Sequence, residues 1–130
     1  MARRRSEMLT SVELEFMKGL WSIGQGSVRQ VMDALSDGGA RAYTSVATVL
    51  KILDQKGYVT AETRGRALVY RPAVSRADYE ARSLRSLSQS LFGGTPSALV
   101  ARLVDDEAVD DAELDAIRRL IDARLGQPDG

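Results

Sequence analysis

The hydrophobic pattern of the chain changes its period at Gly57, and this change restricts the folds that the sequence can adopt. Before that glycine, apolar side chains recur at helical spacing in three segments, residues 11–23, 28–35 and 44–56. After it, residues 58–63 and 68–71 form two strand-like runs around a basic turn. Three short helices and then a two-stranded hairpin are the element order of a winged helix-turn-helix.

Helical spacing returns after Pro72, which ends the hairpin. Three further helices are predicted, at residues 75–92, 96–104 and 111–125. The fold class is therefore mostly α, with a small β-hairpin wing. We predict a winged helix-turn-helix domain at residues 1–74, followed by a helical domain at residues 75–130.

The composition removes most kinds of enzyme from consideration. The 130 residues contain neither Cys nor His, which excludes thiol nucleophiles, imidazole bases, disulfides and thiolate or imidazole metal sites. An enzyme built from carboxylates would need a pair of them in a cleft, whereas the acidic residues at 105–111 fit helix ends and a loop. We therefore expect no catalytic activity, no cofactor and no metal.

The distribution of charge separates the two predicted domains. Residues 1–74 carry eleven basic and seven acidic side chains, a net charge of +4, and the remainder carries −4. This asymmetry favours a polyanionic partner for the first domain. The alternative is that the charges are ordinary solvated surface residues whose uneven distribution arose by chance. No apolar run approaches the length of a membrane span and no signal-peptide core follows the basic start, so we expect a cytoplasmic protein without membrane insertion.

One face of the third predicted helix is small and polar, opposite its apolar face. In a helix-turn-helix, the second helix of the pair enters the major groove, where such a face can bond to bases and phosphates. The guanidinium groups of arginines at the hairpin turn have the geometry to donate paired hydrogen bonds to a phosphate. The predicted DNA contacts are Arg41, Thr44, Ser45, Thr48, Lys51, Arg64 and Arg66. The alternatives are an ordinary solvated helix face and a hairpin tip that is charged for solubility.

The helices after Ser75 carry more apolar surface than a short helical appendage can bury by itself. The predicted dimerisation residues are Leu84, Leu87, Leu91, Leu99, Leu103, Ile117 and Ile121. Because two-fold operators pair with two-fold proteins, the expected partner is a second copy of the chain, which makes residues 75–130 a dimerisation domain. The alternative is a monomeric helical unit that packs on itself.

Several stretches of the sequence occur together in a known family. They are residues 13–21 (ELEFMKGLW), 28–31 (VRQV), 42–53 (AYTSVATVLKIL), 56–57 (KG) and 65–72 (GRALVYRP). In this combination the chain resembles the penicillinase-repressor family of the BlaI/MecI type. The resemblance implies a dimeric winged-helix repressor with interlocked C-terminal helices, which acts on promoters of β-lactam-response or other stress genes.

The same resemblance bears on the inducing signal. Copper-responsive relatives carry cysteines near the C-terminus, and this chain has none, so copper sensing through thiolates is not expected. In penicillin-responsive relatives, a membrane sensor-protease pathway leads to cleavage within the helical domain. Residues 97–103 resemble the cleaved stretch, and Arg102 and Leu103 stand where the best-known relatives have an Asn-Phe bond. A sensor-linked protease is thus an implied partner, with this bond as the candidate cleavage site.

The prediction is a transcriptional repressor that binds inverted-repeat operator DNA as a homodimer and is inactivated by proteolysis in its dimerisation domain. The alternative is a winged helix that serves as a protein-interaction module without sequence-specific DNA binding, since a fold alone does not decide its function.

Overall fold

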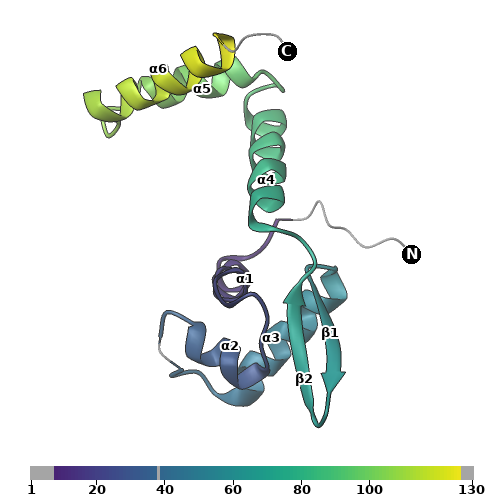
Figure 1. The fold of residues 1–130 in the computed structure, drawn as a ribbon. Helices are drawn as coiled ribbons and strands as arrows, with labels where there is room; N and C mark the ends of the chain where they lie inside the picture. Colours follow the sequence, from purple (N-terminus) through teal and green to yellow (C-terminus); the bar gives the residue numbers. More distant parts are fainter. Residues whose placement is uncertain (1–7, 38, 127–130) are drawn as a thin grey trace. The chain divides into compact units, whose positions relative to one another are not determined.

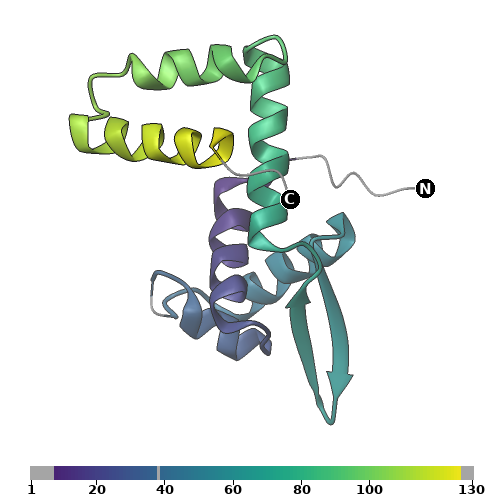
Figure 2. The same ribbon diagram turned by 45° about the horizontal axis from the view of Figure 1, so that its top comes forward.

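The computed structural model of the chain describes residues 8–37 and 39–126. These residues form six helices and one antiparallel hairpin (Figures 1 and 2). In chain order the elements are α1 (Ser11–Ile23), α2 (Val28–Ala34), α3 (Tyr43–Lys56), β1 (Val59–Arg64), β2 (Ala67–Pro72), α4 (Arg76–Leu91), α5 (Pro96–Val104) and α6 (Asp111–Leu125). The predicted fold class, a winged helix-turn-helix followed by helices, is confirmed.

The chain divides into two compact units. Residues up to Ser83 form the first unit, and residues from Leu84 onward form the second. The first unit extends nine residues beyond the boundary predicted after Val74, because Tyr79 is buried in its core. The ring of Tyr79 lies 6.0 Å from the rings of both Trp21 and Tyr58, and its hydroxyl accepts a hydrogen bond from the backbone N–H of Leu9.

The core of the first unit combines one face of each of its first three helices with the base of the hairpin. The fully buried side chains are Phe16, Met17, Leu20, Val31, Val46, Leu50, Leu53, Tyr58 and Val59. Each apolar side chain removed from water in this way contributes about 1.5–3 kcal/mol to folding. Packing of this face orients α3 and leaves its opposite face exposed.

Local signals begin and end the helices where the sequence predicts. Thr10 and Glu13 form a capping box at the start of α1, and Ser27 caps α2 together with Gln30. α3 ends at Gly57, whose φ of 87° and ψ of 13° are left-handed and favour glycine. The starts of α1 and α2 and the end of α3 are therefore determined by a few local residues.

The hairpin is anchored at its base. Strands β1 and β2 pair from Val59 opposite Pro72 to Arg64 opposite Ala67. Gly26, in the turn between α1 and α2, also exchanges two backbone hydrogen bonds with Tyr70 of β2, at 2.8 and 2.9 Å. These bonds hold the base of the wing against the helices, while its tip projects beyond them (Figures 1 and 2).

The second unit is sparsely packed. Its helices α5 and α6 run in opposite directions, joined by residues 105–110 (Figure 2). Neither helix contains a buried residue. None of the described helices combines the length and apolarity that a membrane crossing requires.

Candidate nucleic-acid interface

The exposed face of α3 carries the polar residues that the sequence assigns to DNA. Thr44, Ser45, Thr48 and Lys51 are all exposed, opposite the buried side chains of Val46, Leu50 and Leu53. Thr44 and Thr48 lie one helical turn apart, and Lys51 continues the same stripe. Ser45 lies at the edge of the stripe. The Thr48 hydroxyl donates to the backbone oxygen of Thr44 at 2.9 Å, so it can still accept a hydrogen bond from a ligand.

The four basic side chains among the predicted contacts differ in how they are paired. Lys51 and Arg66 make no ion pair with any described carboxylate. Arg64 pairs with Glu62 of the same strand at 3.2 Å, where both side chains are exposed and the pair contributes little. Lys51 and the two wing arginines are thus available to a polyanion.

Arg41 differs from the other three. Its Nε lies 2.8 Å from Asp37 and its Nη2 lies 2.9 Å from Glu15, while the guanidinium lies 5.7 Å from the centre of the Phe16 ring. Two carboxylates therefore compensate its charge and connect α1 to the segment before α3. These contacts are those of a residue that stabilises the fold.

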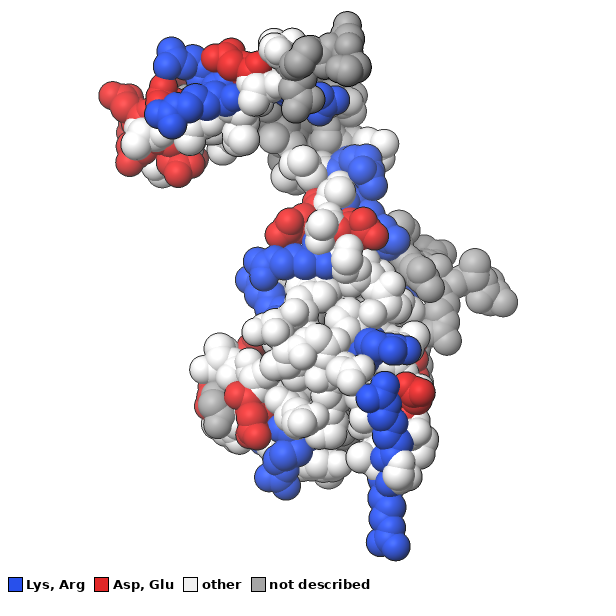
Figure 3. Space-filling view, viewed as in Figure 1, with Lys and Arg blue, Asp and Glu red and all other residues white. Residues whose placement is uncertain are grey.

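The tip of the wing gathers positive charge. Arg64 and Arg66 flank Gly65, whose φ of 63° makes the tight turn between the strands. Figure 3 shows basic side chains lined along the hairpin as far as its tip. A two-stranded ribbon of this kind can follow a DNA backbone while α3 occupies the adjacent groove.

Two residues were missed by the sequence analysis, one at the start of α3 and one in the neighbouring α2. Tyr43 begins α3 and is 50% exposed, and the guanidinium of Arg29 in α2 lies 5.9 Å from the centre of its ring. Arg29 is exposed on the polar side of α2, a signal that the sequence contains. Its proximity to Tyr43 depends on how α2 and α3 pack, which the sequence pattern does not reveal.

A cleft separates α3 from the wing. It has a volume of about 380 Å³ and is lined by Ser27, Val28, Tyr43, Ala47, Arg66, Ala67, Leu68 and Tyr70. Burial, and then the electrostatic effects of Asp54 and Tyr43, raise the pKa of Tyr70 above its ordinary value of 10.0. We call this space the α3–wing cleft.

The predicted dimerisation residues lie on the second unit with their apolar side chains largely uncovered. Leu84, Leu87, Leu91, Leu103 and Ile121 are exposed. Leu99 and Ile117 are half-buried. Further exposed apolar side chains on α5 and α6 are Val100, Val104, Leu120 and Leu125. The described part of the second unit therefore leaves apolar faces of three helices in contact with water.

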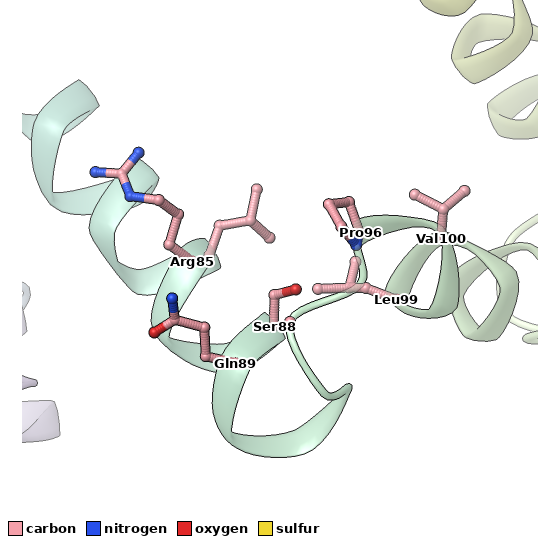
Figure 4. Close-up of a pocket in the computed structure, with 8 residues that line it drawn as sticks. Arg85, Ser88, Gln89, Pro96, Leu99 and Val100 are labelled. Carbon is pink, nitrogen blue, oxygen red and sulfur yellow. The ribbon is translucent and has the colours of Figure 1, made fainter.

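A pocket of about 340 Å³ opens between the end of α4 and the start of α5 (Figure 4). Leu84, Ser88, Pro96, Leu99 and Val100 contribute to its lining. The Ser88 hydroxyl is buried without a hydrogen-bond partner among the described residues, and it points toward α5. The unpartnered hydroxyl and the surrounding apolar side chains therefore lie on a surface that the described residues cover only in part.

Arg102 and Leu103, the candidate cleavage residues, are exposed near the end of α5. A protease binds its substrate in an extended conformation, so cleavage at this bond requires local opening of the helix. No buried residue of α5 opposes that opening.

Comparisons with known proteins show which family the sequence matches. A family profile described as "Penicillinase repressor" matches residues 9–123. The transcriptional regulator BlaI of Mycobacterium tuberculosis is 35% identical over 115 residues, which are 87% of this chain and 82% of that protein. The penicillinase repressor of Bacillus licheniformis is 22% identical over 119 residues, 92% of this chain and 93% of that protein. The solution structure of the Bacillus licheniformis BlaI monomeric form in complex with the blaP half-operator is 28% identical, with a TM-score of 0.48, and the match covers 58% of this chain and 92% of that one.

Proposed function

Because the chain belongs to the penicillinase-repressor family, whose members are transcriptional regulators and not enzymes, we propose that it represses transcription by binding operator DNA. The observation that carries this proposal is the hydroxyl-bearing face of α3 beside a basic wing. These are the two surfaces with which a winged helix meets a duplex. Since the operator lies in the cytoplasm, the repressor acts there.

The two surfaces have different roles in the proposed complex. α3 lies in the major groove, where Thr44, Ser45 and Thr48 bond to base edges and Lys51 reaches a base or a phosphate. Arg64 and Arg66 bind phosphates and set the register of the protein without reading sequence. Arg41 stabilises the position of α3 through Glu15 and Asp37.

The repressor acts as a homodimer through its second unit. Support comes from the exposed leucine row on α4 and from α5 and α6, neither of which has a buried residue. Helices of this kind become stable when their apolar faces are covered, and a second copy offers the same faces. A two-fold dimer presents two copies of α3, so its operator is an inverted repeat with half-sites one or two helical turns apart.

The regulated genes belong to a β-lactam or other stress response, and a sensor-linked protease cuts the chain between Arg102 and Leu103. The exposure of this bond on α5 supports the proposal. A cut there would detach α6, with Ile117 and Ile121, from the rest of the chain. The dimer would separate, and each half would lose the avidity of about 10² to 10⁴ that joining two half-sites supplies.

Promoter binding at several salt concentrations tests the proposal. The full chain should shift a fragment of its own promoter and lose affinity steeply as salt rises, because phosphate contacts release counterions. Binding to no promoter fragment at low salt would overturn the repressor proposal and favour a protein-interaction module.

Sedimentation equilibrium with two matched variants tests the dimer. Leu84→Glu should convert the full chain to a monomer and weaken operator binding by roughly two orders of magnitude. Ser90→Glu adds the same charge to α4 outside the leucine row, and this control should remain dimeric. A full chain that is monomeric at micromolar concentration would contradict the dimer.

A further inference from the structure

We propose that Arg29 and Tyr43 hold one phosphate of the DNA backbone, and that the α3–wing cleft receives the sugar-phosphate strand carrying it. The inference rests on the proposed function and assigns residues that neither the sequence analysis nor the comparisons identify. Arg29 is the phosphate-binding residue in this proposal. Tyr43 is its positioning residue and forms one wall of the cleft.

Arg29 has a charge available for a ligand. It is exposed, and within the described part of the chain no carboxylate pairs with it. Its guanidinium instead lies 5.9 Å from the centre of the Tyr43 ring. A contact with an aromatic face restricts the direction of the guanidinium but neither neutralises it nor uses its N–H donors. The fork is thereby oriented beside the start of α3 and can still bind an anion.

The start of α3 adds to the attraction for an anion at this place. Ala42 precedes the helix and offers no side-chain hydrogen bond to its first amides. At the start of α2, in contrast, Ser27 and Gln30 cap the backbone. Uncapped amides at a helix N-terminus carry a partial positive charge, which adds to that of Arg29.

The cleft matches the chemistry of a DNA strand. Val28, Ala47, Leu68 and Tyr70 give it apolar walls that suit deoxyribose carbons, and Arg66 supplies positive charge from the wing. No acidic side chain is among the described residues that line it. Leu68 is 46% exposed in a strand of the wing, and a sugar packed against it would cover this surface.

The position of the cleft also determines which part of the duplex can enter it. The helices contribute residues from the starts of α2 and α3 to its lining, and the wing contributes Arg66 and residues of β2. If α3 lies in the major groove and the wing follows the neighbouring backbone, the strand between the two must pass through this cleft. A phosphate of that strand then passes Tyr43, where it can meet Arg29, and Arg66 adds positive charge to the same cleft from the wing.

The experiment compares full-length variants on an operator fragment and on a random fragment of equal length. Arg29→Gln should weaken binding to both by about tenfold, the range for a charge-assisted hydrogen bond. It should also lower the slope of log affinity against log salt by roughly one unit, as for one lost phosphate contact. Lys18→Gln removes an exposed charge on α1 and should change neither quantity.

Tyr43 variants separate positioning from a merely structural role. Tyr43→Phe keeps the ring beneath Arg29 and should retain wild-type affinity and salt slope. Tyr43→Ala removes the ring and should reduce both the affinity for DNA and the salt slope. Melting temperatures of all variants should stay near that of the wild type, because Arg29 and half of Tyr43 are exposed.

Replacing single phosphates of the operator by uncharged methylphosphonates locates the contact. One substitution should weaken the wild-type protein and leave Arg29→Gln unaffected, since the variant has already lost that contact. If the wild type binds DNA but Arg29→Gln matches Lys18→Gln in affinity and slope, the phosphate site is wrong while the repressor proposal survives. A wild type that binds neither fragment overturns both. An effect on melting temperature alone makes the Arg29–Tyr43 contact structural and overturns the inference.

Discussion

Lys56, in the last turn of α3, donates hydrogen bonds to both carboxylate oxygens of Glu13, at 2.8 and 3.0 Å. Glu13 is only 7% exposed and also accepts a hydrogen bond from the backbone N–H of Thr10, so one carboxylate caps α1 and connects it to α3. This contact fixes the end of the DNA-facing helix against the first helix of the chain.

Loss of the Lys56 ammonium should therefore destabilise the first unit. Lys56→Met leaves the Glu13 carboxylate buried with fewer partners, which should lower the free energy of unfolding by about 1–3 kcal/mol. Lys51→Met, on the exposed face of the same helix, is the control and should change stability little. Urea unfolding followed by circular dichroism measures both, and equal stability of the two variants would contradict the role of Lys56.

The same carboxylate should make stability depend on pH. Burial alone would raise the pKa of Glu13, but hydrogen bonds from Lys56 and Thr10 and the charge of Lys56 outweigh it and hold the pKa below its usual value of 4.5. A lowered pKa stabilises the fold above the unfolded-state pKa, and this contribution is lost as the pH falls through the folded-state pKa. Unfolding measured from about pH 6 down to about pH 3 should show the decline, and Glu13→Gln should make it shallower.

Thr48 should contribute to operator specificity. Thr48→Ala removes a hydroxyl from the middle of the exposed face of α3, and it should weaken operator binding by about 1–3 kcal/mol, the range for a good base contact. Ser45→Ala should act in the same direction. Neither change should alter binding to random DNA or the melting temperature appreciably. Unchanged operator affinity in both variants would show that another face meets the bases.

The arginines should separate into two groups by the property they change. Arg66→Ala should weaken binding to operator and random DNA alike and lower the salt slope by roughly one unit. Arg64→Ala should act similarly but less, because Glu62 already pairs with it. Arg41→Ala should instead lower the melting temperature, since it breaks the contacts with Glu15 and Asp37. A reduced salt slope with unchanged stability in Arg41→Ala would make it a DNA contact.

The position of a truncation should decide whether the first unit remains stable. A chain ending at Ser83 keeps Tyr79, which packs against Trp21 and Tyr58, and should unfold cooperatively as a monomer. A chain ending at Val74 loses that buried ring and should be less stable by about 3–5 kcal/mol, as for removal of a large aromatic side chain from a core. Denaturant unfolding of the two truncations compares them directly, and equal stability would place the boundary at Val74.

The sequence by itself determined the order of the elements, the position of the hairpin and the face that α3 exposes. Each of these depends on residues close together in the chain. The capping box of Thr10 and Glu13 begins α1, Gly57 ends α3, and the apolar period of α3 separates Val46 and Leu50 from Thr44 and Thr48. Propensity and periodicity act over a few residues, so such features can be predicted from the sequence.

Only the tertiary structure decided which side chains remain available at the candidate interface. Arg41 meets Glu15 across 26 residues of sequence, which is why its charge is compensated although it lies just before α3. Arg29 reaches Tyr43 because α2 packs beside α3, and Tyr79 joins the core of the first unit because α4 begins against Trp21. These contacts join residues that are distant in the chain, and no local pattern specifies which of the many exposed charges or aromatic rings will meet.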